Sequence, residues 1–399
     1  MATVFMNGNV IVGTGEVIEK GAVVINGNMI TFVGPNKRIR PSKKNIVYDI
    51  SGKTVLPGLI DCHVHLCLDG SPDPITSLIK ESIPVTSIKA VHHAQLTLET
   101  GVTTVRDMGG REYIDLAIRD SIESGLIKGP RMICSGKIVC MTGGHGWQFG
   151  REASGVDDVR EAVREQLKMG VNFIKLIATG GVMTKGVDPG ATQFTLEELM
   201  AGVEEARKAG RRTATHAQGT EGIKNSLRAG VNSIEHGFFL DDEAIELMLE
   251  RNAYLVPTLS APYQIIRGGV KGGVPLFAVE KSKSVMKSHF QSVRRAYKSK
   301  IPIAMGTDAG TPFNCHGENL KEMELLVKAG FTPMEAVMAT TKTASEVLGL
   351  EKKIGTLEKG KVADLIVLDG DPLKDITLLQ KKDKILAIIK DGHFFKCQL

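Results

Sequence analysis

Two histidines stand two residues apart near the beginning of the chain, inside a run of apolar residues. His63 and His65 belong to the segment LIDCHVHL (59–66), and side chains two apart project from the same face of a strand. Two imidazoles on one face of a buried strand either pair with carboxylates or bind a metal ion together. The spacing alone is a weak signal, so the choice depends on which residues other segments bring to the same place.

Four more polar residues lie within or at the end of other apolar runs. They are Lys175 in FIKLIA, His216 in RTATHA, His236 in NSIEHG and Asp308 in IPIAMGTD. The lysine is the least expected of them, because burial of a charged amine is unfavourable. Either its ammonium extends to the strand end or pairs with an aspartate, or the amine loses its proton and captures CO2. The resulting carbamate is an anionic ligand with two oxygens.

Together these residues predict a centre of two divalent metal ions. One ion would be bound by His63, His65 and Asp308 and the other by His216 and His236, with carbamylated Lys175 between them. Nitrogen and oxygen donors without thiolates favour zinc. A metal pair lowers the pKa of a bridging water, and the hydroxide so formed attacks the substrate while Asp308 passes the proton to the leaving group. The predicted chemistry is metal-dependent hydrolysis.

These donors require several strands that end at one place, and the sequence supplies eight candidates. The candidate strands are 59–66, 103–108, 131–136, 172–179, 212–217, 232–237, 253–258 and 301–308. Amphipathic helices separate them and end repeatedly in glycine, which readily adopts the left-handed conformation after a last helical turn. Those glycines are Gly101, Gly125, Gly170, Gly210, Gly230 and Gly330. Strands alternating with helices predict an α/β fold, a (β/α)8 TIM barrel whose active site lies at the carboxyl ends of the strands.

Both ends of the chain depart from this alternation and are rich in short strands. Residues 1–56 contain β-rich runs broken by Asn-Gly and Gly turns, and residues 363–371 and 384–395 have the same character. Chain ends often lie close together in a domain. We therefore expect 1–56 and 361–399 to form one small sheet domain, and 57–360 to form the barrel.

The motifs around the donors resemble the amidohydrolase superfamily. The matching pieces are GKTVLPGLIDCHVH, the strand lysine, GTDAG and GTLEKGKVADLIVLDGDP, which span almost the whole chain. TTVRDMGG, MTGGHG and HGENLKEMELLVKAG are similar to its peptidase-like branch, which includes Xaa-Pro dipeptidases, arginine/lysine carboxypeptidases, ochratoxin-type amidases and imidazolonepropionase-like proteins. The resemblance implies a distorted barrel, a β-sandwich made from both chain ends, and a homo-oligomer.

Three further residues are expected at the substrate. His145 lies in a glycine-rich loop where, in the resembling branch, a histidine contacts the scissile carbonyl, so we assign it a catalytic and substrate-binding role. Gln218 stands where dipeptidase-like relatives often carry Tyr or His, which puts prolidase activity in doubt. His316 either contacts substrate or caps the helix that follows. Arg106 and Asp107 are expected to form an internal ion pair that supports the ligands.

The predicted reaction is hydrolysis of an amide C–N bond in an N-acyl amino acid, a dipeptide or a similar small amide. The alternative is hydrolysis of an ester, lactone, carbamate or urea at the same centre. Mononuclear deaminases lack a bridging lysine, so Lys175 argues against a deaminase or cyclic amidase, and the full donor set argues against a non-catalytic scaffold. The segment 180–193, rich in Gly and Thr, is either a lid over the site or a connector.

Composition excludes several other classes of partner. The net charge of +5 is spread along the chain without a basic stripe, which argues against nucleic acid. No run approaches the ~18 apolar residues of a membrane span, and the first residues do not resemble a secretory signal. Six scattered cysteines without a CxxC motif indicate reduced thiols. We therefore expect a cytoplasmic enzyme with a small-molecule substrate.

Overall fold

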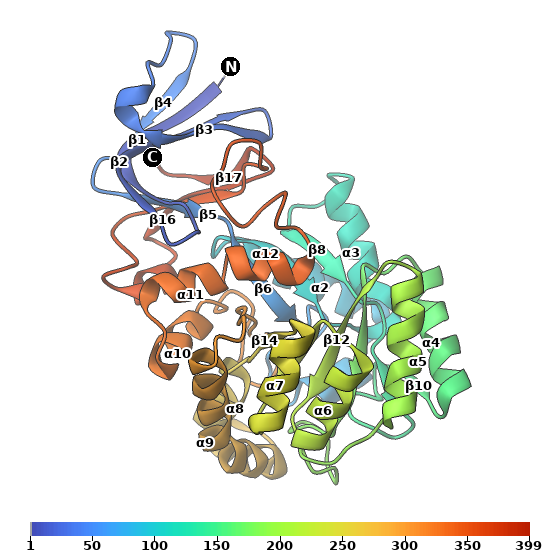
Figure 1. The fold of residues 1–399 in the computed structure, drawn as a ribbon. Helices are drawn as coiled ribbons and strands as arrows, with labels where there is room; N and C mark the ends of the chain where they lie inside the picture. The colour runs from blue at the N-terminus through green and yellow to red at the C-terminus, as the bar shows by residue number, and fades with distance from the viewer. Residues whose placement is uncertain (1) are drawn as a thin grey trace.

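A computed structural model describes residues 2–399, and strands alternate with helices through most of them in an α/β fold (Figure 1). Two parallel sheets carry the residues singled out above. The first has the order β6-β7-β8, formed by Leu59–Val64, Val102–Asp107 and Arg131–Cys134. The second has the order β10-β9-β11-β12-β13-β14, formed by Arg151–Ala153, Val139–Met141, Phe173–Ile177, Arg212–Ala217, Ser233–His236 and Tyr254–Val256.

The register of the second sheet brings three predicted donors to its carboxyl end. Lys175 on β11 pairs with Ala214 on β12, and His216 follows Ala214 by two residues. His236 on β13 pairs with Ala217, one residue further along β12. Residues two apart share a face of a strand, so Lys175 and His216 project to the same side of the sheet.

The segment 301–308, predicted as the eighth strand, forms isolated bridges instead of a ladder. Ile303 bridges to Leu255 on β14, and Ala309 bridges to Val64 on β6, so the segment still runs between the two parallel sheets. Pro302 has no N–H to donate to a ladder. Asp308 has a φ of 60°, which turns the chain out of the extended conformation.

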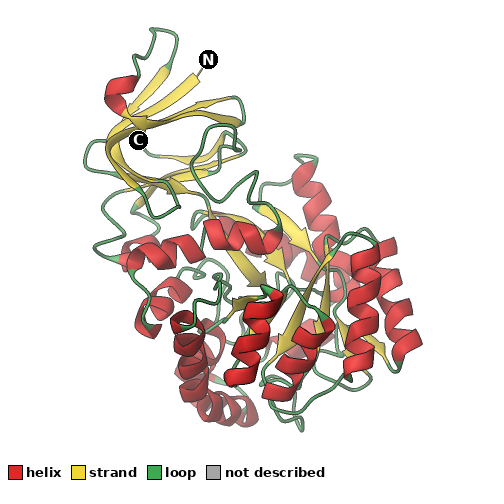
Figure 2. Cartoon of the chain, viewed as in Figure 1, coloured by secondary structure: helices red, strands yellow, loops and turns green. Residues whose placement is uncertain are grey.

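Within residues 2–399 the helices surround the parallel strands (Figure 2). Their bounds are α1 Pro74–Lys80, α2 Ile83–Leu98, α3 Ile114–Glu123, α4 Val156–Lys168, α5 Leu196–Lys208, α6 Thr220–Ala229, α7 Asp242–Arg251, α8 Ser260–Gly268, α9 Leu276–Lys298, α10 Lys321–Ala329, α11 Pro333–Ala339 and α12 Lys342–Leu348. Helices α4 to α7 pack side by side in chain order. The six glycines predicted to end helices all have positive φ, from 66° to 117°.

Strands from both ends of the chain form one further sheet, at the end of the molecule where both termini lie (Figure 1). Its order is β17-β16-β15-β5-β1-β2-β3, with β4 beside β1. The strands are β1 Ala2–Ile11, β2 Val17–Asn26, β3 Met29–Pro35, β4 Ile46–Asp49, β5 Thr54–Pro57, β15 Leu365–Leu368, β16 Ile385–Lys390 and β17 His393–Cys397. The ladders join all eight strands into one sheet and do not by themselves divide it into the two layers of a sandwich.

The terminal sheet has a core of its own. Phe5, Val23 and Val55 from the first part of the chain pack with Leu365 and Val367 from the last part, all of them buried. The two chain ends therefore share apolar side chains as well as backbone hydrogen bonds. No helix within residues 2–399 combines the length and apolar character needed to cross a membrane.

Candidate functional site

The carboxyl ends of the parallel strands surround a cavity. The six predicted donors all line it: His63, His65, Lys175, His216, His236 and Asp308. They come from the end of β6, from β11, from the ends of β12 and β13, and from the bridge-forming segment 301–309. Sequence segments up to 245 residues apart therefore meet at one place, as the strand assignment predicts.

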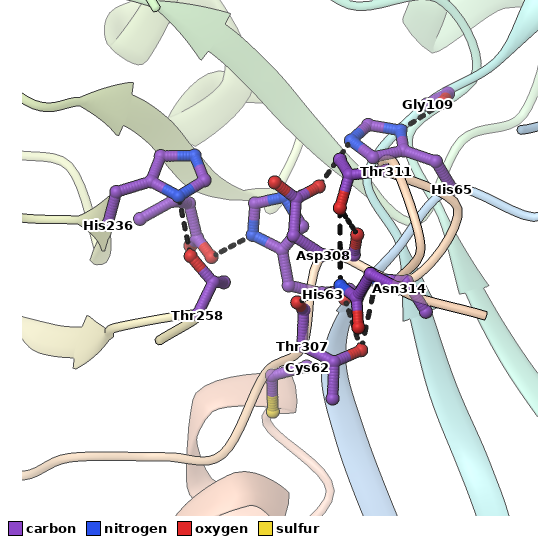
Figure 3. Close-up of polar contacts among 12 residues, drawn as sticks. Cys62, His63, His65, Gly109, His236, Thr258, Thr307, Asp308, Thr311 and Asn314 are labelled. Atoms are coloured by element: carbon purple, nitrogen blue, oxygen red, sulfur yellow. Dashed lines mark hydrogen bonds and ion pairs between the residues drawn. The ribbon is translucent and has the colours of Figure 1, made fainter. Parts of the chain in front are cut away.

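His63, His65 and Asp308 form the tightest of these groups (Figure 3). One donor atom from each residue lies within 4.8 Å of the others, as required of groups that share one cation. The Asp308 Oδ1 atom is 3.4 Å from His63 Nε2 and 3.5 Å from His65 Nε2. Burial lowers the pKa of His65 to about 4, so its ring is neutral and offers a lone pair.

The Nδ1 atoms of His63 and His65 already have hydrogen-bonding partners, and these partners determine whether each Nε2 carries a proton or a lone pair. His63 Nδ1 lies 2.9 Å from the Glu235 carboxylate, and His65 Nδ1 lies 2.7 Å from the carbonyl of Gly109. Both partners are acceptors, so each Nδ1 carries the proton and donates it. Each Nε2 then presents a lone pair beside Asp308, which is the tautomer that a metal ligand needs.

His216 and His236 form the other half of the donor set, with ring centroids 4.4 Å apart. His236 Nδ1 lies 2.7 Å from the Thr258 hydroxyl, and His216 Nε2 donates to the carbonyl of Gly180 at 3.1 Å. The His63 and His236 rings are 5.0 Å apart, so the two halves adjoin. Burial lowers the pKa of both His216 and His236 well below the usual value, so both rings are neutral and can bind a metal ion.

The surroundings of Lys175 indicate whether the residues of this site fit a metal centre. Its side chain is 2% exposed, and its Nζ finds no hydrogen-bonding partner anywhere in residues 2–399. Burial lowers the pKa of this amine to about 8. An orphaned amine among neutral imidazoles is unfavourable as it stands, whereas a carbamate on Nζ would turn it into an anionic oxygen ligand. The donor chemistry of the site therefore fits divalent cations.

Asp308 has the properties of a group that accepts and returns a proton. Burial raises the pKa of its carboxyl to about 7, although the neighbouring Lys175 charge lowers it. A base is most effective when its pKa is close to the working pH. Its φ of 60° is matched by left-handed values at His236 (73°) and Thr258 (53°). Such conformations are unfavourable for residues other than glycine and persist where the surrounding structure imposes them.

A buried network behind His63 was not recognised from the sequence. Glu235 accepts from His63 with one carboxylate oxygen, and with the other it accepts from Arg106 at 2.8 Å and from the Ser233 hydroxyl at 2.6 Å. The expected ion pair between Arg106 and Asp107 is wrong, because consecutive strand residues point to opposite faces. Asp107 instead accepts from the backbone N–H groups of Leu66 and Gly109. Glu235 directly precedes His236 in the sequence, and nothing in the sequence pattern marked it as a partner of His63.

Asp61 joins β6 to the segment that carries Asp308. Its carboxylate accepts from the backbone N–H groups of His63 at 3.0 Å and Thr307 at 3.1 Å. It also accepts from the Thr307 hydroxyl at 2.6 Å and the Asn319 amide at 2.8 Å. The two bonds to Thr307, together with the bond of 2.7 Å from the Asp308 N–H to the His63 carbonyl, hold Asp308 next to His63. This role accounts for the buried acid two residues before His63.

The structure brings two of the three predicted substrate residues to the cavity. His145 lines it, with its ring 4.4 Å from His216 and its Nδ1 2.7 Å from the Thr184 hydroxyl. Gln218 also lines it and is 2% exposed. His316 does not line the cavity; its Nε2 donates to the carbonyl of Leu68 at 3.0 Å and its ring stacks on a neighbouring histidine, His93.

The segment 180–193 contributes Val182, Met183 and Thr184 to the cavity wall. One side chain of α9 holds this segment in place: Lys281 donates from its Nζ to the carbonyls of Gly181, Thr184 and Val187. The hydroxyl of Thr184 in turn contacts His145. The segment is therefore part of the site, with its backbone tied to a helix outside it.

Comparison with known proteins gives consistent matches over the whole chain. The sequence profile of the amidohydrolase family matches residues 54–394. Ochratoxinase from Aspergillus niger is 31% identical over 99% of this chain and 86% of its own length. A crystal structure of a Xaa-Pro dipeptidase with bound methionine in its active site is 35% identical, with a TM-score of 0.91 over 99% of this chain and 100% of its own. A prolidase complexed with N-methylphosphonate-L-proline is 30% identical, with a TM-score of 0.91 over 100% of both chains.

Proposed function

This chain belongs to the amidohydrolase family and is a hydrolase acting on C–N bonds, and from that premise we propose that it cleaves an amide bond of a small substrate at a centre of two divalent metal ions. The observation that carries the proposal is the convergence of six donors around one cavity, with the Lys175 amine left unpaired among them. A structural role alone does not account for a buried lysine that bonds to nothing. The substrate classes in view are N-acyl amino acids, dipeptides and similar amides.

The donor set suggests how the ions would be held. His63, His65 and Asp308 would bind one ion, His216 and His236 the other, and a carbamate on Lys175 both. Zinc is the ion that neutral imidazoles and carboxylate oxygens favour most here. When bound, the ions would supply Lewis acidity for the scissile carbonyl and an activated water at neutral pH.

The chain's own residues would handle the proton and the carbonyl. Asp308 would accept the proton of the attacking water on its carboxylate and return it to the leaving nitrogen. Burial lowers the pKa of His145 to about 3, so its ring is neutral. If the Thr184 hydroxyl donates to Nδ1, His145 presents an Nε2–H that can donate to the carbonyl oxygen of the substrate.

Hydrolysis of an ester, lactone, carbamate or urea is the second candidate, because the same attack serves those carbonyls. We also propose that the two parallel sheets and segment 301–309 form one distorted (β/α)8 barrel over residues 57–360. Its support is the pair of bridges that link this segment to β14 and β6. Residues 1–56 and 361–399 would then form the β-sandwich domain, which the pairing of β15 with β5 supports.

The proposal is tested by metal content together with turnover. Purified protein should hold about two metal equivalents per chain, and chelation should abolish amide hydrolysis that added zinc restores. A panel of N-acyl amino acids, dipeptides, neutral amides and aryl esters would rank the substrate classes. Metal-free protein with chelator-insensitive turnover would contradict the metal centre, and turnover of esters without any amide would favour the second candidate.

A further inference from the structure

We propose that the substrate is an uncharged amide with a bulky apolar group beside the scissile bond. This inference rests on the proposed function and selects, among its substrate classes, neutral amides over N-acyl amino acids and dipeptides that carry a free carboxylate. The three observations behind it are an apolar wall next to the donors, the charges around the cavity, and one unpaired side-chain oxygen. Each bears on what the cavity can accept next to the reacting carbon.

The cavity surface beside His65 is made of one cluster of apolar side chains, which we name the apolar wall: Leu68, Ile75, Ile138, Phe149 and Ile177. The wall begins at the donors themselves. The ring of Phe149 meets the ring of His65 at 73° with centroids 5.8 Å apart, and Ile177 stands two residues after Lys175 on β11. A substrate held at the donors must therefore lay one of its substituents on this wall, and burial of an apolar substituent is favourable there.

The charges around the cavity are confined to the proposed metal centre. Among the described residues that line it, Lys175 and Asp308 alone are formally charged, and both belong to the donor set. Lys281 lies behind segment 180–193, but its ammonium is already satisfied by three backbone carbonyls. Proteins recognise carboxylates through arginine forks or free ammonium groups. A carboxylate next to the scissile bond would find no arginine and no free lysine among the described residues that line the cavity.

Gln218 supplies the third observation. Its side chain is 2% exposed and lines the cavity, and its Oε1 has no hydrogen-bonding partner within residues 2–399. A buried carbonyl oxygen without a donor is unfavourable, so a ligand that brings an N–H to it gains a bond that the empty cavity lacks. An amide N–H of the substrate meets this need, whereas a carboxylate has no hydrogen to donate to this oxygen.

Matched substrates separate the neutral class from the charged class. N-hexanoyl-phenethylamine and N-hexanoyl-L-phenylalanine differ only by a carboxylate on the carbon next to the scissile nitrogen, and N-hexanoyl-L-phenylalaninamide restores neutrality at equal size. We expect kcat/KM of the metal-loaded enzyme to be about 30-fold or more higher for the two neutral amides. Uncleavable ketone analogues of the three compounds, measured by titration calorimetry, should show the same order of affinity.

A single substitution in the apolar wall should invert this preference. Ile75 is half-buried, so Ile75→Arg can extend a guanidinium along the cavity without complete desolvation. It should raise kcat/KM for the carboxylate substrate relative to the neutral ones by about 10-fold or more. Ile75→Met keeps the wall apolar and should leave the ratio unchanged, and equal metal content in both variants shows that the centre is intact.

Different results would contradict the preference for uncharged substrates and the proposed amide hydrolysis. Carboxylate compounds that bind or react as well as their neutral partners would overturn the inference while leaving amide hydrolysis in place. Turnover of none of the amides would contradict the proposed function, and the calorimetric order of the ketone analogues would still decide whether the cavity prefers uncharged ligands.

Discussion

At the level of single residues, three of the predicted metal ligands are oriented by groups that do not line the cavity. Glu235 orients His63, the Gly109 carbonyl orients His65, and Thr258 contacts His236. Such partners fix which nitrogen of each ring carries the proton, and their loss typically lowers metal affinity by about 10- to 100-fold. Two substitutions test the site at this scale.

Replacement of Lys175 by alanine should remove the anionic bridge. We expect about one metal equivalent to be lost per chain and activity to fall by about 100-fold or more, as loss of one electrostatic element of a site does. Short carboxylates such as propionate should restore part of the activity, because they can occupy the space of the carbamate. Lys168→Ala, an exposed lysine on α4, is the control. Full activity in Lys175→Ala would rule out the bridge.

Replacement of Glu235 by glutamine should weaken the centre from behind. The change keeps the shape but removes the charge between Arg106 and His63, so the buried guanidinium loses its partner. Zinc affinity should fall by about 10- to 100-fold, and the free energy of unfolding by about 3–5 kcal/mol. Metal titration and denaturant unfolding measure these effects, with exposed Glu250→Gln as the reference. An unchanged zinc affinity would show that Glu235 has only a structural role.

The sequence was sufficient to single out the six residues that meet at the cavity, because each ends or interrupts an apolar run, where a polar residue needs a reason. It was insufficient for Glu235, since strand alternation places Glu235 and His236 on opposite faces and says nothing of what lies behind the first histidine. His316 shows the converse difficulty. A histidine next to a glycine looks accessible in the sequence, yet its ring is buried against His93.

At the level of elements, loops without regular structure complete the site. Segment 301–309 carries Asp308 and is held by Asp61, while segment 180–193 covers one side of the cavity and is held by Lys281. In both, a charged side chain adds to scattered backbone hydrogen bonds, such as those from the Asp308 N–H to the His63 carbonyl and from the Gln193 N–H to the Ala178 carbonyl. Because one side chain of α9 donates to three carbonyls of the second segment, a single substitution tests its contribution.

Lys281→Met should free the backbone of residues 181–187, because three carbonyls lose a shared donor. Thr184 would no longer be held against His145, and we expect kcat/KM to fall by about 10- to 100-fold with zinc content unchanged. Steady-state kinetics and hydrogen exchange of the segment measure this effect. Lys283→Met, an exposed lysine on the same helix, should have neither effect. If hydrogen-exchange protection of this segment in Lys281→Met equals that in the unsubstituted protein, the proposed role of Lys281 is contradicted.

Helix ends were predictable because glycine marks them, and six of six predicted glycines adopt positive φ. The eighth strand was not predictable in its detail. IPIAMGTD has the apolar run of a buried strand, but Pro302 removes a donor and Asp308 takes a left-handed conformation. The segment keeps its place through scattered backbone hydrogen bonds to β6 and β14 and through bonds to the Asp61 side chain, and the local pattern does not reveal the latter.

At the level of the whole molecule, the terminal sheet is attached to the parallel strands by Arg131. This residue begins β8, and its guanidinium donates to Asp364 and Asp391, which lie just before β15 and just after β16. Burial raises the pKa of Asp391, whereas the charge of Arg131 lowers it. The net effect is a pKa below the usual value. These ion pairs thus add to an apolar contact between the two parts, in which Ile366 and Ile388 of the terminal sheet share a core with Leu59 of β6.

Arg131→Met should lower the free energy of unfolding by about 1–3 kcal/mol at pH 7. A carboxyl with a depressed pKa stabilises the fold above its unfolded pKa of about 3.9, and this contribution disappears as the pH falls through the folded value. The difference between the two proteins should therefore shrink below about pH 4. Urea unfolding across pH measures it, with exposed Arg251→Met as the control. A difference that does not change with pH would indicate lost packing instead of lost charge.

The pairing of β15 with β5 also sets an order of events during synthesis. Val55 and its partner Val367 are separated by more than 300 residues, which a ribosome adds in roughly 15 to 60 s. Throughout that time β5 has an open edge on the side where β15 will bind, and an open strand edge invites pairing with other chains. The nascent protein therefore has to protect its first strands until its last ones emerge, a demand that falls on chaperones and translation speed.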